Sequence, residues 1–520
     1  MRYHVAMATF SRRHVLAALA SAPALILDRK SGAQDALPEI AKGPFDGSAE
    51  ALKSYQVPEW FRDAKFGIWA HWGPQSGVEA GDWYARNMYI ETQAQYKYHL
   101  QFYGHPSKVG YKDLCPMWKG DRFDPDHLMS LYKKAGAKYF MSMGVHHDNF
   151  DLWNSKFQPR WNAVATGPKK DVVGLWRKAA QKQGLRFAVS EHLSNSYNWL
   201  AVSHGADKTG PMAGVPYDGT DPAYADLYHP FPKDKPIPTQ AMSREAPDSW
   251  KLLWFRRIKD LIDNYQPDLL YTDGGIPFGD YGYKLVSHYY NANAEQHKGK
   301  VEGVFTSKTR QDCDRGTCVL DIERGVANDI LPNPWQTDTC IGNWHYKRDL
   351  KYKTPKTVID MLCDIVSRNG NLMLNIPLPN SGQPDGDELA VLDGITRWMA
   401  VNSEGIYGTR PWKVSGNLPA PSTQEQGFNE RNRKDLTAGD VRFTTKGPAL
   451  YAFVMGWPER EAAVPTLALG GKLGVGKIRN VELLGHKGKL TFTQDETSLR
   501  VQLPPQKPSD YAVTLRITGA

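Results

Sequence analysis

PDLLYTDGG, residues 267–275, reads as an apolar strand that ends in one acidic residue and a pair of glycines. Its leucines and tyrosine are typical of strands that are buried on both faces in a parallel sheet. The two glycines allow a tight turn with positive φ. Asp273 is therefore predicted at the C-terminal tip of a strand, where α/β barrel enzymes place catalytic groups. A turn aspartate that bonds its own backbone would give the same local pattern.

On both sides of this strand, short apolar strands alternate with amphipathic helices from about residue 60 to 405. The helices are predicted near 127–134, 172–184, 250–265 and 358–370, and strands near 65–70, 138–144, 185–190, 269–272, 317–321 and 371–376. This alternation indicates a parallel sheet, and the length favours a (β/α)8-like catalytic barrel over residues 45–410. Eight clean repeats cannot be counted, which leaves a distorted or incomplete barrel open.

Two regions depart from this alternation. Residues 201–248 are rich in Gly, Pro, Asp and Tyr without a helical period, and they follow a predicted strand end. Long segments of this kind are usually functional loops, so we expect one that shapes the substrate site. Residues 411–520 change to a period of two, with apolar positions 499, 501 and 503 as one example. Many short strands over about 100 residues predict a C-terminal β-sandwich.

Composition and the N-terminus limit the class and the compartment. The 520 residues are 41% apolar and 23% charged with a net charge of +8, and no Lys/Arg run supports nucleic-acid binding.

Ser11-Arg12-Arg13-His14-Val15-Leu16 is a twin-arginine pattern, followed by an apolar stretch too short for a membrane anchor. Residues 1–33 are predicted to be a removed signal peptide, and the mature protein to be periplasmic without membrane attachment. Of the five cysteines, Cys313 and Cys318 are close enough in sequence for a local disulfide. Whether this disulfide forms is left open by the sequence.

Polar side chains follow four predicted strands at the same end. They are His71, His146, His147, Glu191, His192 and Asp273. Such a group suits either a metal ion or a sugar. Adjacent residues of a strand point to opposite faces, so His146 and His147 would need a bend to reach one ion, and no metal is expected. Imidazoles that bind hydroxyl groups, with tryptophans that pack on C–H faces, favour sugar chemistry.

Glycoside hydrolysis requires a pair of carboxylates, and retaining enzymes hold them roughly 5 Å apart. Asp273 suits the nucleophile. Glu323, at the end of TCVLDIERG (317–325), is the favoured acid/base, and Asp321, Glu302 and Asp338 are its competitors. A surface salt bridge between Glu323 and the neighbouring arginine is the structural alternative.

Several motifs in this order resemble glycoside hydrolase family 29, the α-L-fucosidases. They are WFRDAKFGIWAHWG (60–73), DWYARNMY (82–89), HHDNFDLWNS (146–155), GPKKDVVGLW (167–176), GLRFAVS (184–190), the TDGG turn, PWQTDTCIGNWHY (334–346), NGNLMLNIP (369–377) and NSEGIYGTRPW (402–412). The tail also resembles the β-sandwich of that family.

The resemblance implies a retaining double displacement that removes terminal α-L-fucose from an oligosaccharide or glycoconjugate, without a cofactor or metal. It assigns Asp273 as the nucleophile and His71, His146 and His147 as ligands of fucose hydroxyls, and it places Trp83 near the sugar. Trp69 and Trp344 are further candidates for lining the pocket. Linkage specificity and oligomeric state stay open.

This chain departs from the family pattern at several positions. Asp82 and Gln336 stand where glutamate is common, and Asn149 stands where glycine is common. Ser190-Glu191 replaces a common tyrosine pair, so Glu191 or His192 is expected to take over a fucose contact. Two alternatives stay open at this point. One is a related retaining glycosidase of the α-L-galactosidase type, and the other is a fucose-binding protein with a dead site.

Overall fold

The computed structural model describes residues 36–417, except 233 and 239, and residues 428–519. The predicted signal peptide, residues 1–33, lies outside these described residues. Among the described helices, none is both long and apolar enough to cross a membrane.

Eight parallel strands close into a barrel in chain order. They are β1 (Phe66–Ala70), β2 (Tyr139–Val145), β3 (Arg186–Glu191), β4 (Leu269–Thr272), β5 (Val304–Ser307), β6 (Val319–Asp321), β7 (Trp335–Cys340) and β8 (Gly370–Asn375). The last strand pairs with the first, with Phe66 opposite Leu372. The predicted barrel is confirmed, and its sheet is complete. Strands β5 and β7 were absent from the sequence prediction.

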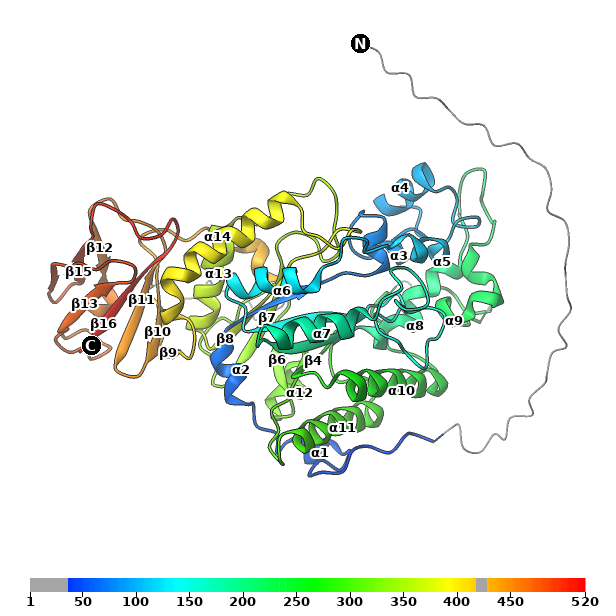
Figure 1. The fold of residues 1–520 in the computed structure, drawn as a ribbon, viewed down its shortest axis with the longest axis horizontal. Helices are drawn as coiled ribbons and strands as arrows, with labels where there is room; N and C mark the ends of the chain where they lie inside the picture. Colours follow the sequence, from blue (N-terminus) through cyan, green and yellow to red (C-terminus); the bar gives the residue numbers. More distant parts are fainter. Residues whose placement is uncertain (1–35, 233, 239, 418–427, 520) are drawn as a thin grey trace, which may run out of the picture. The chain divides into compact units, whose positions relative to one another are not determined.

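Helices cover the barrel unevenly. The α-helices are α1 (Ala49–Leu52), α2 (Glu59–Ala64), α3 (Tyr84–Asn87), α4 (Ala94–Phe102), α5 (Tyr111–Leu114), α6 (Pro125–Lys134), α7 (Val172–Lys182), α8 (Ser196–Trp199), α9 (Ala225–Tyr228), α10 (Asp248–Tyr265), α11 (Asp280–Gln296), α12 (Arg310–Asp314), α13 (Pro355–Ser367) and α14 (Gly386–Asn402). Long helices α10 and α11 lie side by side (Figure 1). The β5–β6 crossover holds only the five-residue α12, and the described residues 322–334 between β6 and β7 contain no helix. The distortion therefore lies in the helical layer.

Helix α7 illustrates how the sequence sets these elements. Asp171 caps it by accepting a hydrogen bond from the Gly174 amide at 3.0 Å. Trp176, Ala179 and other apolar residues on one side are buried, as the predicted periodicity required. The helix ends before Gly184, whose φ of +69° suits glycine, and the chain enters β3.

The described residues of the segment 201–248 form only short single turns before α10 begins at Asp248, in agreement with the missing helical period. Buried tyrosines hold it together through carboxylates. Tyr217 donates to Asp207 at 2.5 Å, and Tyr228 donates to Asp218 at 2.5 Å. Further along, Arg244 reaches the turn after β4 and donates to the carbonyl oxygen of Asp273 at 2.8 Å. The loop thus returns to the C-terminal end of the barrel strands.

The C-terminal region forms two antiparallel sheets. The larger has the order β13-β16-β11-β10-β9 and the smaller β12-β15-β14. Their bounds are β9 (Arg410–Gly416), β10 (Val441–Lys446), β11 (Ala449–Val454), β12 (Glu461–Val464), β13 (Asn480–Leu483), β14 (Phe492–Gln494), β15 (Leu499–Gln502) and β16 (Val513–Thr518). Alternate side chains such as Leu499 and Val501 from one sheet and Leu515 and Ile517 from the other share one core. The predicted C-terminal β domain is confirmed.

One buried ion cluster joins barrel helix α13 to the C-terminal sheet. Asp364 accepts from Arg368 at 3.1 Å and from Arg442 of β10 at 2.5 Å, and all three residues are buried. Burial by itself raises the pKa of Asp364, but the charges of the arginines outweigh burial and hold the pKa well below its usual value. The stabilisation is therefore present above the unfolded-state pKa of about 3.9 and is lost as the pH falls through the lower folded-state value.

Asp364→Ala is expected to destabilise the protein by about 3–5 kcal/mol, because it leaves two buried guanidinium groups without their counter-ion. The measurement is the apparent melting temperature at pH 7 by calorimetry. Asp393→Ala is the matched control, since Asp393 pairs with Arg397 on the exposed face of α14, and it is expected to cost less than about 0.5 kcal/mol. Equal melting temperatures for the two variants would contradict the stabilising role of the cluster.

Candidate active site

A cavity of about 260 Å³ lies at the C-terminal ends of the barrel strands. It is lined by Trp69, His71, Asp82, Trp83, His146, His147, His192, Met242, Tyr271, Asp273, Lys308, Glu323, Asp338, Trp344 and Phe428. Five of them directly follow the strands β1 to β5, namely His71, His146, His192, Asp273 and Lys308. Pockets for drug-sized ligands are usually about 300–1,000 Å³, so this cavity suits one small ring.

Asp273 follows β4 and is fixed by its neighbours. Its amide donates to the carbonyl of Glu191 at 3.2 Å. The next residue, Gly274, has a φ of +115°, and a Cβ there would lie 2.4 Å from the guanidinium of Arg244. Gly275 is not in the positive-φ region, so only the first glycine of the predicted turn uses this freedom.

Three cationic or polar groups converge on the Asp273 carboxylate. Lys308 Nζ lies 2.7 Å from Oδ1, and His147 Nε2 lies 3.1 Å from Oδ2. His192 Nδ1 is 3.6 Å from the same Oδ2. Burial by itself raises the pKa of Asp273, but the Lys308 charge and the histidine contacts outweigh burial and hold the pKa well below its usual value. Asp273 is therefore an ionised carboxylate, as a nucleophile requires.

Lys308, directly after β5, joins the two principal carboxylates. Besides contacting Asp273, its ammonium group donates a hydrogen bond to Oε2 of Glu323. Its backbone amide donates to the carbonyl of Gly274 at 2.9 Å. Burial opposes the charge of Lys308, but Asp273, Asp338 and Glu323 raise its pKa well above the usual value. A permanent cation thus stands between Asp273 and Glu323.

Glu323, two residues after β6, has the properties of an acid. Burial raises its pKa to about 7, and the negative charges of Asp338 and Asp273 act in the same direction against the lowering effect of Lys308. Its side chain is 18% exposed and lines the cavity. Two carboxyl groups with pKa values moved apart in this way are typical of an acid and a nucleophile that work together.

The predicted competitors of Glu323 are placed differently. Asp321 is absent from the cavity lining and accepts from Gln336 at 2.6 Å, and burial together with Asp338 raises its pKa well above the usual value. Glu302 is also absent from the lining and contacts Lys300 at 2.5 Å. Asp338 lines the cavity, but its Oδ2 accepts from Tyr271 and lies 3.7 Å from Lys308. Glu323 is the best-placed partner of Asp273.

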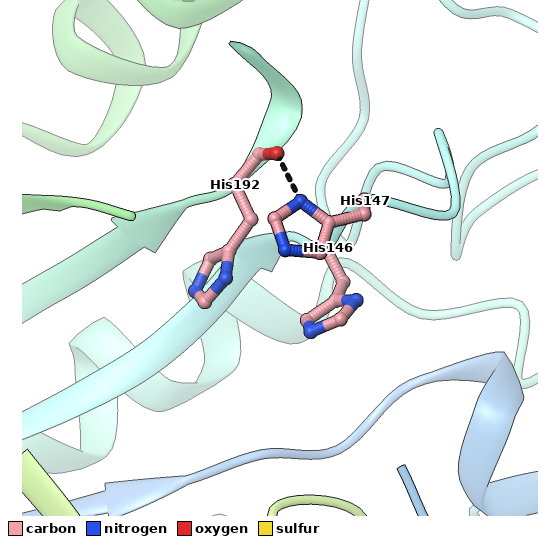
Figure 2. Close-up of side chains that lie close together, drawn as sticks. All are labelled: His146, His147 and His192. Atoms are coloured by element: carbon pink, nitrogen blue, oxygen red, sulfur yellow. Dashed lines mark hydrogen bonds between the residues drawn. The ribbon is translucent and has the colours of Figure 1, made fainter. Parts of the chain in front are cut away.

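Three histidines lie close together (Figure 2), and two of them, His147 and His192, contact Asp273. His146 and His147 follow the end of β2, and His192 follows β3. His147 Nδ1 donates to the backbone carbonyl of His192 at 2.7 Å, the dashed line in Figure 2. Both ring nitrogens of His192 are buried and have no hydrogen-bond partner, which makes this ring available to a ligand. Burial lowers the pKa of His192 to about 4.

The hydrogen bonds of two other histidines fix which nitrogen carries the proton. Burial holds the pKa of both His71 and His146 well below the usual value, so both rings are neutral. His71 Nδ1 lies 3.2 Å from the amide oxygen of Asn375, which leaves Nε2 as an acceptor. His146 Nδ1 accepts from Gln75 Nε2 at 3.0 Å, which leaves Nε2 as a donor. Together they present one acceptor and one donor to a polyhydroxylated ligand.

A buried arginine holds the loop that carries His146 and His147. Arg257 of α10 donates to Asp151 at 2.5 and 3.2 Å and also bonds the side chain of Asn149. Asn149 has a φ of +64°, a conformation that asparagine tolerates better than most residues. This tolerance explains why asparagine can stand at position 149, where glycine is common in the family pattern.

The opposite-face argument about His146 and His147 was wrong, because the strand ends at Val145 and both rings reach one cluster. In two groups, His146–His147–His192 and Asp82–His146–His345, the possible metal-ligand atoms lie within 4.8 Å of one another. The two ring nitrogens of His147 face the His192 carbonyl and the Asp273 carboxylate. Neither nitrogen therefore offers a metal ion the free lone pair that ligation needs. Asp82 is engaged by His345 Nδ1 at 2.6 Å. These contacts favour hydroxyl groups over an ion.

The prediction for Glu191 requires a correction. Glu191 is buried but does not line the cavity. Its carboxylate is used inside the fold, where it accepts from Thr272 Oγ1 at 2.5 Å, Trp254 Nε1 at 3.1 Å and the Leu193 amide at 3.0 Å. The side chain points away from the site because Glu191 still belongs to β3, whereas His192 follows the strand. His192 therefore holds the position that was predicted for either residue.

Aromatic rings complete the walls. Trp83 and Trp344 both line the cavity as predicted, with Trp344 4.9 Å from the ring of His71. Residues that the sequence analysis did not place at the site are Lys308, Tyr271, Met242 and Phe428. A lysine that follows a strand, as Lys308 does, is the sequence signal that would have placed a cation at this site.

A larger cavity of about 360 Å³ lies elsewhere and is lined in part by Arg62, Cys313 and Cys318. Asp314 is the only carboxylate among its described lining residues, so it lacks the pair that sugar hydrolysis requires. The sulfur atoms of Cys313 and Cys318 lie 2.9 Å apart, and both are free thiols.

Two family models match the chain. The model described as Alpha-L-fucosidase matches residues 33–404, and the Alpha-L-fucosidase C-terminal domain matches residues 433–518. Among known relatives, the tissue alpha-L-fucosidase of Rattus norvegicus is 27% identical over 488 residues, which cover 90% of this chain and 91% of the rat protein. The human plasma alpha-L-fucosidase is 26% identical over 506 residues and covers 91% of this chain and 92% of its own.

Solved structures share the fold. The alpha-fucosidase of Thermotoga maritima in complex with fucose superimposes with a TM-score of 0.68 at 23% identity, over 91% of this chain and all of that one. A GH29 alpha-L-fucosidase of Bacteroides thetaiotaomicron, solved as a trapped covalent intermediate, gives a TM-score of 0.59 at 18% identity over 92% of this chain and all of that one.

Proposed function

Because the chain belongs to the α-L-fucosidase family of glycoside hydrolases, we propose that it removes terminal α-L-fucose from fucosylated glycans by a retaining double displacement. The observation that carries the mechanism is Lys308, whose single ammonium group contacts both Asp273 and Glu323. Two carboxylates that share one donor have their nearest oxygens within about 6 Å. That spacing supports retention, since inverting enzymes keep their carboxyl groups roughly 6.5–9.5 Å apart.

In the first step, ionised Asp273 attacks C1 of fucose while protonated Glu323 donates its proton to the leaving oxygen. The C1–O bond to the leaving group breaks as the C1–O bond to Asp273 forms. In the second step, Glu323 removes a proton from water, which attacks C1 and releases Asp273. His71, His146 and His192 orient the hydroxyl groups, and His147 holds the Asp273 carboxylate. Trp83 and Trp344 contact the ring and methyl faces.

Two observations bear on the alternatives. A fucose-binding protein with a dead site has no need for a low-pKa carboxylate and a high-pKa carboxyl group joined by one lysine, and this site has both. A related α-L-galactosidase differs in the group carried by C5, which is a methyl in fucose and a hydroxymethyl in galactose. Tryptophans beside the site favour the methyl group.

The direct test is nitrophenol release from aryl α-L-fucoside and aryl α-L-galactoside. A ratio of kcat/KM well above one in favour of the fucoside supports the proposal. Turnover of the galactoside alone would replace it, and tight fucose binding without turnover of either substrate would identify a binding protein.

The pH dependence of kcat/KM is expected to be flat in weak acid and to fall above about pH 7. Glu323 must be protonated in the first step, and burial raises its pKa to about 7, so activity falls tenfold per pH unit beyond that value. The acidic limb belongs to Asp273 and lies below pH 3.8, because the Asp273 pKa is lowered. The measurement is kcat/KM for aryl fucoside from pH 4 to 9. Persistence of the alkaline limb in Glu323→Gln would assign that limb to another group.

We also propose that the mature protein acts in the periplasm after twin-arginine export. The proposal rests on the arginine pair and the apolar stretch within residues 11–27. N-terminal sequencing of the protein from a periplasmic fraction tests it, and an intact Met1 would contradict it.

A further inference from the structure

Two large apolar side chains remain about half exposed at the cavity of the candidate active site. Phe428 is 49% exposed and Met242 is 46% exposed, and both line the cavity that contains Asp273 and Glu323. The deeper wall is different, since Trp69 and Tyr271 are each only 1% exposed. Exposed apolar groups beside a buried polar site mark its entrance as a binding surface.

Phe428 stands on the leaving-group side of the site. Its backbone amide donates to the carbonyl oxygen of Glu323 at 2.7 Å. A general acid must lie beside the oxygen that departs, so whatever flanks Glu323 at the entrance faces the departing group. A cavity of about 260 Å³ holds one small ring. When fucose fills it, the sugar to which fucose is attached must lie at this entrance.

Hydrogen bonds of the two residues that follow Phe428 help to fix it in this place. It has a φ of +64°, a conformation that non-glycine residues rarely adopt and that is concentrated at functional sites. The side-chain amide of the next residue, Asn429, bonds both the amide and the carbonyl of Val326 at 3.1 Å. Glu430 accepts from Thr339 at 2.7 Å and from Arg324 and Lys353 at 3.0 Å each.

Met242 approaches from a different part of the chain. It belongs to the segment 201–248, and two residues later Arg244 is anchored to the carbonyls of Asp273 and Gly275 at 2.8 and 2.7 Å. Methionine is flexible and polarisable, so it adapts to ligands of different outline. One rigid aromatic ring and one adaptable side chain thus border the same entrance.

We propose that Phe428 and Met242 form the acceptor subsite, which binds the apolar C–H face of the sugar to which fucose is attached. The inference rests on the proposed function and deepens it. Phe428 lies between β9 and β10 of the C-terminal domain, so this domain takes part in choosing the glycan. The subsite favours acceptor sugars that present a continuous C–H face, as aromatic platforms do.

The test compares substrates whose leaving groups differ in size. For Phe428→Ala, kcat/KM is expected to fall roughly tenfold on nitrophenyl α-L-fucoside and on each fucosyl disaccharide that the wild type cleaves, mainly through KM. On α-L-fucosyl fluoride, whose leaving group is one atom, the loss is expected to be at least fivefold smaller. Met242→Ala is expected to show the same pattern with a smaller effect.

Two control variants make the result decisive. Phe428→Tyr keeps the ring face and is expected to retain most of the wild-type kcat/KM on nitrophenyl fucoside and on disaccharides. Phe102→Ala removes an aromatic side chain that is 58% exposed outside the cavity, and it is expected to behave as wild type. An equal loss on fluoride and disaccharide, or no loss on either, would overturn the acceptor subsite. Wild-type protein that hydrolyses no fucoside at all would instead overturn the proposed function.

Discussion

Asp273→Gly is expected to lower kcat/KM for aryl α-L-fucoside by on the order of 10⁴-fold, because the variant lacks the group that forms the covalent intermediate. Added azide is expected to restore turnover, since a small anion fits the space left by the carboxylate. Azide would then attack from the side that Asp273 occupied, so the product is β-L-fucosyl azide. Its configuration can be read by NMR.

The stereochemistry of this product provides its own control. Azide-dependent turnover with a β-configured product identifies Asp273 as the nucleophile. Retention of wild-type activity by Asp273→Gly would transfer that role to another aspartate of the cavity lining, Asp338 or Asp82. Glu302→Ala is the matched control for loss of a carboxylate outside the cavity, and its activity is expected to equal that of the wild type.

Glu323→Ala is expected to separate substrates by leaving group. Fucosides with poor leaving groups, such as disaccharides, need protonation of the departing oxygen and are expected to lose roughly 10³-fold in kcat/KM. Dinitrophenyl fucoside departs without a proton and is expected to lose far less in the first step. Azide is expected to accelerate this variant as well, but here it attacks the fucosyl-enzyme and gives α-L-fucosyl azide.

The opposite anomers obtained from the two variants distinguish the two roles within one experiment. An equal loss for Glu323→Ala on both classes of substrate would reject Glu323 as the acid. In that case Asp338→Asn is the next variant to examine, because Asp338 lies 3.7 Å from the same lysine.

Sequence patterns were sufficient for strands with apolar runs and clear ends. The strand before Asp273 and the helix capped by Asp171 follow from local signals, and both have the predicted place. Strand β7 was not predicted, because its residues Gln336 and Asp338 are polar and yet buried. Their partners are Asp321 and Tyr271 on other strands, so only the closed barrel explains how they are satisfied.

The candidate site was predictable where chemistry coincides with a strand end. His71, His146, His147, Asp273 and Glu323 all fall at the cavity for this reason. Lys308 was missed because the strand before it, β5, reads VFTS and has only two apolar residues, so no apolar run marks a strand end there. Phe428 was missed because it lies about 100 residues beyond Glu323 in the chain and reaches it only through tertiary contacts.

The lysine shared by the two carboxylates has a consequence for the electrical state of the site during turnover. At rest, the three groups Asp273 (anionic), Glu323 (neutral) and Lys308 (cationic) sum to zero among themselves. Asp338, which lies 3.7 Å from Lys308, takes no part in either step and contributes equally to both states. In the fucosyl-enzyme, Asp273 is a neutral ester and Glu323 has lost its proton, so the sum is zero again. Lys308 exchanges one counter-ion for the other, so the net charge of these three buried groups is the same in both half-reactions. Neither step therefore creates a new unpaired charge in a buried place, where such a charge is costly. The same cation therefore balances the charge of the nucleophile Asp273 before the first step and the charge of the base Glu323 before the second.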